Sequence, residues 1–281
     1  MAIKIVTDST SDIPADIAKK LNIMVVPLNI HFGEDVYKDG IDLTTDSFFE
    51  KLVTDPRHPS TSQPSMGEFV DAYKKIASDG DEIISIHITS KLSGTFNSAT
   101  QAAAQLKDQI KVHVIDTSHI SCTIAYSAIA AAESIANGDS AEEAIAIAKS
   151  VAERSHFYAL FDTLEYLAKG GRIGKAQSLL GGLLKVKPIL RTNDGVIDTY
   201  KRARSRKSGI LMLNQTARSF DKLDELCVIY TTDSTDAEAL AEEVSDLLPD
   251  GKKPLLIQVG PVIGTHAGPN LIGLGCVESK S

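Results

Sequence analysis

The sequence predicts an α/β protein of two domains, and three observations support this. Short apolar segments alternate with helical segments through the first half, which is typical of a mostly parallel sheet with helices on both faces. Past residue 155 the pattern changes to paired strands, which favours a C-terminal α/β domain with a mixed sheet. The 281 residues suit one large domain or two small ones, and with 43% hydrophobic residues the chain can build a core. We therefore expect domains over residues 1–155 and 156–281.

The elements of the first half follow from apolar runs and helical periodicity. Strands are predicted at residues 3–6, 23–27, 82–88 and 112–115, with an extended stretch at 28–39. Helices are predicted at residues 13–21, 44–52, 67–77, 94–106, 120–136 and 141–154. Pro14 lies in the first turn of the first helix, where proline is tolerated. Pro and Ser residues predict a loop at 55–65.

The second half is predicted in the same way. Strands are expected at residues 157–161, 187–191, 196–200, 226–231 and 255–259. Helices are expected at residues 163–168, 176–184, 205–218 and 235–248, the second interrupted by Gly181 and Gly182. Asp194-Gly195 between two of the strands is a strong hairpin signal. Glycines and prolines predict a loop over 260–270.

Three loops carry hydrogen-bond donors suited to an anion. Residues 260–270 hold His266 among small residues, and a histidine there can donate a hydrogen bond near neutral pH. Residues 61–65 and 90–95 are rich in Ser and Thr, and each precedes a predicted helix. Backbone N–H groups at a helix N-terminus are a ready site for a carboxylate or phosphate. Ser and Thr also cap helices routinely, so the residues alone leave both interpretations open.

Composition and charge exclude several classes of protein. There is no Trp and aromatic residues make up 5% of the chain, which argues against a nucleic-acid stacking platform. Cys122, Cys227 and Cys276 are widely separated and show no metal or disulfide spacing, so we expect reduced cysteines and a cytoplasmic protein. The sequence shows no signal peptide and no apolar run of membrane-spanning length.

The charge is uneven along the chain. The net charge is −8, yet residues 169–207 hold eleven Lys/Arg against two Asp/Glu. One basic segment in an acidic protein indicates a surface for a protein partner, although a solvated face explains it as simply.

Taken together, five motifs resemble those of the DegV family, bacterial fatty-acid-binding proteins of which some serve as the lipid-carrying subunit of a fatty acid kinase. The resemblance runs in order from residue 3 to about residue 275. Asn270 is one departure, because the family pattern has Gly there. The motifs lie at residues 7–12, 61–64, 90–95, 169–173 and 264–269.

The resemblance implies a function and a set of residues. It implies a long-chain fatty acid such as palmitate, stearate or oleate in a buried tunnel between or within the domains, no cofactor and no metal, and a monomer that presents the lipid to the ATP-binding kinase subunit. The residues implied for the carboxylate are Thr61, Ser62, Ser93, Gly94 and His266. The residues implied for docking the kinase are Arg172 and Arg204, with Arg202 as the alternative to the latter. Ile263, Leu271 and Phe96 are further candidates for the tunnel wall, with ordinary core packing as the alternative.

Three other functions are alternatives to fatty-acid binding. A serine hydrolase acting on acyl substrates through Ser93 and His266 remains the main alternative, although the Gly-x-Ser-x-Gly elbow is absent. Against a kinase that acts alone, the sequence contains no Gly-rich phosphate-binding motif. Asp8 and Asp12 could bind a metal, but helix capping explains both residues more simply. A DNA-binding regulator finds support only in the basic segment.

Overall fold

A computed structural model describes residues 2–180 and 186–280. Its first half is built around a four-stranded sheet in the order β2-β1-β6-β7, with every pair parallel. The strands are β1 (Ile3–Asp8), β2 (Ile23–Val26), β6 (Glu82–His87) and β7 (Lys111–Asp116). The predicted parallel sheet is therefore confirmed.

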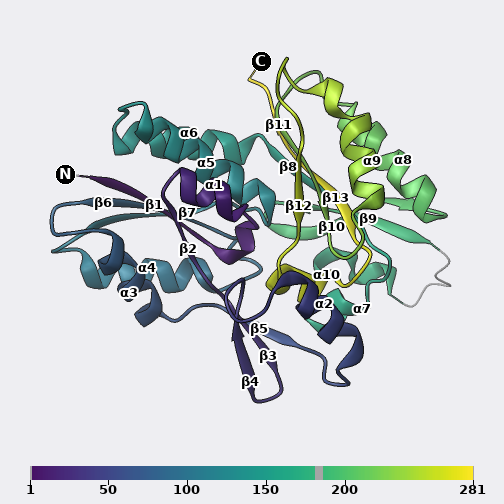
Figure 1. Cartoon of the computed structure of the whole chain (residues 1–281), viewed down its shortest axis with the longest axis horizontal. Coiled ribbons are helices and arrows are strands. Elements are labelled where there is room, and N and C mark those ends of the chain that lie inside the picture. Colours follow the sequence, from purple (N-terminus) through teal and green to yellow (C-terminus); the bar gives the residue numbers. More distant parts are fainter. Residues whose placement is uncertain (1, 181–185, 281) are drawn as a thin grey trace.

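Helices cover both faces of this sheet (Figure 1). Alternate residues of the strands enter two separate cores, so that Ile5 and Ile84 face one layer while Val6 and Ile83 face the other. On the first face lie α1 (Ala15–Lys20), α5 (Cys122–Ala136) and α6 (Ala141–Glu153). On the second face lie α3 (Met66–Ile76) and α4 (Thr95–Leu106).

The second half is built around a six-stranded mixed sheet in the order β10-β9-β8-β13-β11-β12. Only β11 and β12 pair in parallel; the other neighbours are antiparallel. The strands are β8 (Ser155–Leu160), β9 (Lys187–Asn193), β10 (Val196–Ala203), β11 (Leu223–Tyr230), β12 (Leu255–Gln258) and β13 (Ile272–Glu278). On the outer face lie α8 (Arg206–Ala217) and α9 (Thr235–Glu243), followed by the 3₁₀ helix η3 (Ser245–Leu247).

Helix α5 joins the two halves. It contacts β1 on one side and β13 on the other. Its alanine-rich sequence lets both sheets approach it closely, and one hydrophobic core accordingly contains residues from both halves. The division into domains at residue 155 stays a prediction.

A three-stranded antiparallel sheet completes the fold, in the order β4-β3-β5. Its strands are β3 (Asn29–Phe32), β4 (Asp35–Lys38) and β5 (Ser60–Ser62), and α2 (Thr45–Thr54) packs with it in a small aromatic core. The remaining elements are the 3₁₀ helices η1 (Ser9–Ser11) and η2 (Gly174–Leu179), with α7 (Glu165–Lys169) and α10 (Pro261–Ala267).

Four predictions about elements need correction. The predicted loop at 55–65 contains strand β5, because residues 60–62 pair with β3. The predicted loop at 260–270 is largely helix α10. Strand β13 was not predicted, although it lies in the middle of its sheet. The helix predicted at 176–184 is a 3₁₀ helix up to Leu179, and residues 181–185 lie outside the described residues.

Candidate functional site

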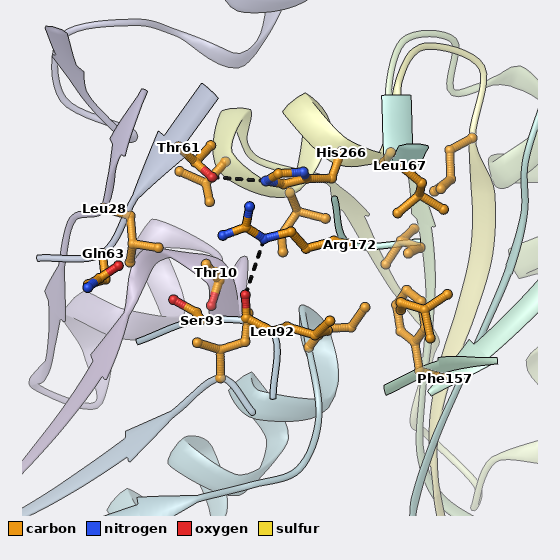
Figure 2. Close-up of a pocket in the computed structure, with 18 of the residues that line it drawn as sticks. Thr10, Leu28, Thr61, Gln63, Leu92, Ser93, Phe157, Leu167, Arg172 and His266 are labelled. Carbon is orange, nitrogen blue, oxygen red and sulfur yellow. Dashed lines mark hydrogen bonds between the residues drawn. The ribbon is translucent and has the colours of Figure 1, made fainter. Parts of the chain in front are cut away.

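A cavity lies where the two large sheets, the small sheet and α10 meet. Figure 2 shows polar side chains, among them Thr61, Ser93 and His266, on one side of it and Leu167 and Phe157 on the other. Its polar lining residues are Thr10, Thr61, Ser62, Gln63, Ser93, Arg172 and His266. Its apolar lining residues are Leu28, Ile88, Leu92, Ile120, Phe157, Phe161, Leu167, Ile197, Ile229, Val262, Ile263, Ala267 and Leu271. The site can therefore take an amphipathic ligand with one polar end.

Thr61 and His266 meet at the polar side of this cavity. Thr61 lies on β5, opposite Ile30 of β3, and its Oγ1 lies 2.9 Å from His266 Nε2. Burial, with smaller contributions from the nearby Arg172 and His58, lowers the pKa of His266 to about 4. The imidazole is therefore neutral at pH 7 and carries one N–H donor.

The second imidazole nitrogen of His266 is unusual. His266 Nδ1 is buried and has no hydrogen-bond partner within the described residues. It lies against the α-carbon of Gly170, where an added Cβ would come within 2.1 Å of Nδ1. Only glycine leaves room for the ring at this point.

Helix α10 sets the position of His266. Pro261 occupies its first turn, where a missing N–H costs nothing, and Thr265 donates its hydroxyl to the Pro261 carbonyl at 2.9 Å. Gly268, with φ of 73°, ends the helix in a conformation that glycine adopts freely. His266 thus lies in the last turn of a short buried helix instead of on an open loop.

Ser93 both lines the cavity and bonds to the start of α4. Its Oγ accepts the Thr95 N–H at 3.3 Å and lies 2.8 Å from Thr95 Oγ1. Gly94 itself is not one of the lining residues. A Cβ on Gly94 would come within 2.8 Å of the Gln63 amide nitrogen, so this glycine allows Gln63 to close over the turn.

The hydroxyl of Ser62 is held by the small sheet. It accepts a hydrogen bond from Asn29 Nδ2 at 3.2 Å and lies 2.9 Å from His31 Nε2. These bonds tie Ser62 to β3, while its neighbour Thr61 pairs with His266.

The two arginines predicted for docking lie in different places. Arg172 lines the cavity, and its guanidinium donates to the Gly170 carbonyl at 2.8 Å and the Leu92 carbonyl at 3.3 Å. Arg204 is exposed just before the N-cap residue of α8, and Arg202 is exposed on β10. Arg172 therefore lines the cavity together with His266, whereas Arg204 does not line it.

Sequence reasoning missed part of the lining. Thr10 and Gln63 belong to the motifs at residues 7–12 and 61–64, but neither was predicted to bind the ligand. Ile263 and Leu271 line the cavity as expected of tunnel candidates, whereas Phe96 does not. Phe157, Phe161, Ile197 and Ile229 could not be found by sequence, because alternation alone does not show which face of a strand borders a cavity.

A separate Ser-His-Asp arrangement lies in the core of the first half. His87 Nδ1 is 2.8 Å from Asp8 Oδ2, and His87 Nε2 is 2.7 Å from Ser85 Oγ. Ser85 Oγ is also 2.8 Å from Tyr73 OH, and all four residues are fully buried. No substrate can reach Ser85 there, so the arrangement stabilises the core. It touches the cavity through Thr10 and Ile88, two lining residues that both hydrogen-bond to Asp8.

Residues 2–180 and 186–280 show neither a candidate metal-binding cluster nor a membrane-spanning helix. They contain no group of three or more His, Cys, Asp or Glu side chains arranged to hold a metal ion. None of the helices described combines the length and the apolar character needed to cross a bilayer.

Comparisons with known proteins agree over the whole chain. A family model described as "Uncharacterised protein, DegV family" matches residues 2–279. Protein DegV of Bacillus subtilis is 36% identical over 285 residues, covering 98% of each chain. A structure described as fatty acid binding of a DegV family protein from Thermus thermophilus has 32% identity and a TM-score of 0.90, covering 99% of this chain and 100% of that one. The structure of DegV from Bacillus subtilis, described as a fatty acid binding protein, has 34% identity and a TM-score of 0.87, with the same coverage.

Proposed function

Because this chain belongs to the DegV family, we propose that it binds a long-chain fatty acid in the cavity and presents the carboxylate to the ATP-binding subunit of a fatty acid kinase. The observation that carries the proposal is the division of the cavity into a polar side and an apolar remainder. Relatives described as fatty acid binding support it, one of them from Eubacterium ventriosum described as stearic acid-binding, at 30% identity and a TM-score of 0.86.

The apolar lining residues match the needs of an acyl chain. Burying a methylene is worth about 0.8 kcal/mol, so fourteen contribute roughly 11 kcal/mol before ordering costs. Phe157, Phe161 and Ile229 supply such a surface without a charged side chain.

The polar lining residues match the needs of a carboxylate. Burying a charge without hydrogen-bond donors is costly. Thr61, Ser93 and the neutral His266 offer uncharged hydrogen-bond donors. Because these donors do not neutralise the carboxylate, it can still attack ATP as a nucleophile. Arg172 adds a positive charge nearby and reduces the cost of holding the anion.

The kinase step is proposed on the family resemblance and on the basic segment. Arg204 is exposed and suited to a protein contact, whereas Arg172 is suited to both the partner and the cavity. In this proposal the protein works in the cytoplasm as a monomeric carrier, and the chemistry occurs on the partner.

The hydrolase alternative finds little support in the geometry. His266 Nε2 is hydrogen-bonded to Thr61, and Ser93 Oγ is hydrogen-bonded to Thr95. In the described residues, no carboxylate contacts His266 Nδ1, so nothing orients the imidazole as a base. Labelling of Ser93 by a fluorophosphonate would restore this alternative.

The direct test is to identify what the protein carries. Extraction of the purified protein followed by lipid analysis should yield one long-chain fatty acid per chain, and the delipidated protein should take up a fluorescent fatty acid at micromolar concentration. Protein that is free of lipid and takes up none would contradict the proposal.

A further inference from the structure

Two buried carboxyl groups lie behind the wall of the cavity and hold the start of α10. Asp12 Oδ1 accepts the Gly260 N–H at 2.9 Å, and Asp12 Oδ2 accepts the Ser121 hydroxyl. The carboxyl group of Asp39 lies beside the Ser9 hydroxyl and the Val262 N–H. The N-cap residue Gly260 has no side chain, so Asp12, from the other half of the molecule, supplies the capping acceptor, with Asp39 beside it.

Both carboxyl groups lie close to the ligand site. Val262, whose N–H lies beside Asp39, lines the cavity and lies one helical turn before His266. On the other wall, Ser121 bonds to Asp12 and directly follows the lining residue Ile120. A negative charge at the polar side of the cavity therefore acts on both carboxyl groups through low-dielectric protein.

The two carboxyl groups are also close to each other. An added Cβ on Gly260 would lie 3.0 Å from Asp12 Oδ1 and 3.6 Å from Asp39 Oδ1. Asp39 is 5% exposed; Asp12 is partly exposed as a residue, but its carboxyl group faces inward. Burial, with a smaller contribution from the neighbouring carboxylates, raises the pKa of each to about 7, although hydrogen bonds to each carboxyl group oppose the shift.

Several other charged or titratable groups surround this pair. Asp8 lies beside both and is paired with His87, and the thiol of Cys122 faces Asp12. Lys19 of α1 lines the solvent-open cleft in front of the pair, and Asp46 of α2 is hydrogen-bonded to Gln258 of that cleft. On the cavity side the titratable group is His266, with the charged or titratable groups Arg172 and His58 near it. The exposed residues Lys19 and Ile41 in the cleft show that protons can exchange with solvent.

We propose that Asp12 and Asp39 are specificity-determining residues of the fatty-acid site, which take up a proton when the ligand's carboxylate binds, so that the protein holds the anion more tightly as the pH falls from 8 to 6. The inference rests on the proposed function, because the ligand's negative charge is what drives the uptake. An anion that raises each pKa by about half a unit changes the affinity about tenfold across the titration. A neutral ligand of the same chain length produces no such change.

The test compares a long-chain fatty acid with the fatty alcohol of equal length on delipidated full-length protein. Titration calorimetry at pH 7, in buffers with different heats of ionisation, gives the number of protons taken up. We expect measurable uptake with the acid and none with the alcohol, and an acid affinity that falls about tenfold between pH 6 and pH 8.5. Failure of both ligands to bind would contradict the proposed function itself. Binding of both without uptake would overturn only this inference.

Variants distinguish proton uptake by Asp12 and Asp39 from proton uptake by the histidines. Asp12→Asn and Asp39→Asn keep an oxygen acceptor for the α10 N–H groups and remove the charge, so each should reduce proton uptake and tighten acid binding at pH 8.5 several-fold. The control Asp16→Asn, on the exposed side of α1, should behave as wild type. A purely structural role predicts weaker binding of acid and alcohol alike at every pH, and that result would contradict the proposal. If the variants do not fold, the pH dependence of proton uptake by the wild-type protein distinguishes the two assignments. Uptake that peaks near pH 7 supports Asp12 and Asp39, whereas uptake that peaks near pH 5 would assign the proton to His266.

Discussion

Thr61 Oγ1 and His266 Nε2 lie 2.9 Å apart although 205 positions separate them in the chain. One residue comes from a three-residue strand in the first half, the other from a seven-residue helix in the second. The polar side of the cavity therefore exists only when the halves are assembled. The Gly260–Asp12 bond ties the same helix to the first half over 248 positions.

Replacing Ser93 or His266 with Ala should weaken fatty-acid binding while the protein stays folded. Each change deletes a hydrogen bond to a charged acceptor, worth about 1.5–3 kcal/mol, or roughly ten- to hundredfold in affinity. Fluorescent fatty-acid titration measures the affinity, and urea unfolding measures the stability. Ser65→Ala is the matched control, because Ser65 forms the capping box of α3 and does not line the cavity. Unchanged affinity in both test variants would show that the head group lies elsewhere.

Gly170→Ala should disable the site chiefly through His266, with a milder contact to the Tyr166 carbonyl at 3.2 Å. Gly170 has an ordinary right-handed backbone conformation, so the substitution strains no dihedral angle. The new Cβ would lie 2.1 Å from His266 Nδ1 and would push the ring away from Thr61. We expect a loss of affinity of the same order as for His266→Ala. Gly67→Ala, whose Cβ meets nothing closer than 3.9 Å, serves as the control and should bind normally.

The stability of the ligand-free protein should fall as the pH rises from about 6.5 to 8. The pKa values of Asp12 and Asp39 are raised to about 7, so the folded state binds more protons than the unfolded chain, and this stabilisation is lost as the pH rises through 7. Burial is the main cause that lowers the pKa of His119 and of His266 to about 4. These two histidines therefore make stability rise with pH, but only between about pH 4 and 6.5. Urea midpoints measured across this range check the prediction. The Asp12→Asn/Asp39→Asn double variant should lose the decline above pH 6.5, and a decline that persists in it would contradict the assignment.

Arg204→Ala should leave fatty-acid binding near normal and reduce acyl-phosphate formation with the kinase subunit and ATP. Arg204 is exposed, and a contact through it should weaken with salt, because charges are screened within about 8–10 Å at physiological ionic strength. Lys207→Ala, also exposed in the same basic segment, is the matched control. Arg172→Ala tests a mixed role, because this residue also lines the cavity. Normal kinase activity in both arginine variants would end the docking hypothesis.

Local signals predicted the parallel sheet and the hairpin well. Strands β1 and β6 are rich in Ile and Val and are buried along most of their length, as expected of parallel strands covered on both faces. The hairpin turn has φ of 49° at Asp194 and 73° at Gly195, which is the conformation that Asp-Gly favours. Asn270, the departure from the family pattern, has φ of 61°, which Asn tolerates better than most residues.

The errors arose where distant contacts decide the structure. The glycines of β13 hid the strand, yet the sheet needs them: a Cβ on Gly273 would lie 2.6 Å from the Tyr158 carbonyl, and one on Gly275 would lie 2.2 Å from Cys122 Sγ. Helix α10 looked like a loop because the acceptor at its start comes from Asp12, 248 positions away in sequence. The cavity wall depends on the same long-range packing, which no local pattern records.

The position of β13 has a consequence for how the protein is made. It is the last strand of its sheet in chain order, but it lies between β8 and β11 and pairs with both. While the ribosome is still synthesising it, the earlier strands can assemble only as two separate pieces, β8-β9-β10 and β11-β12. The nascent chain must therefore keep two strand edges unpaired until β13 emerges and inserts between them. Ribosome-bound chains halted before Ile272 should be the ones that chaperones hold and proteases cut.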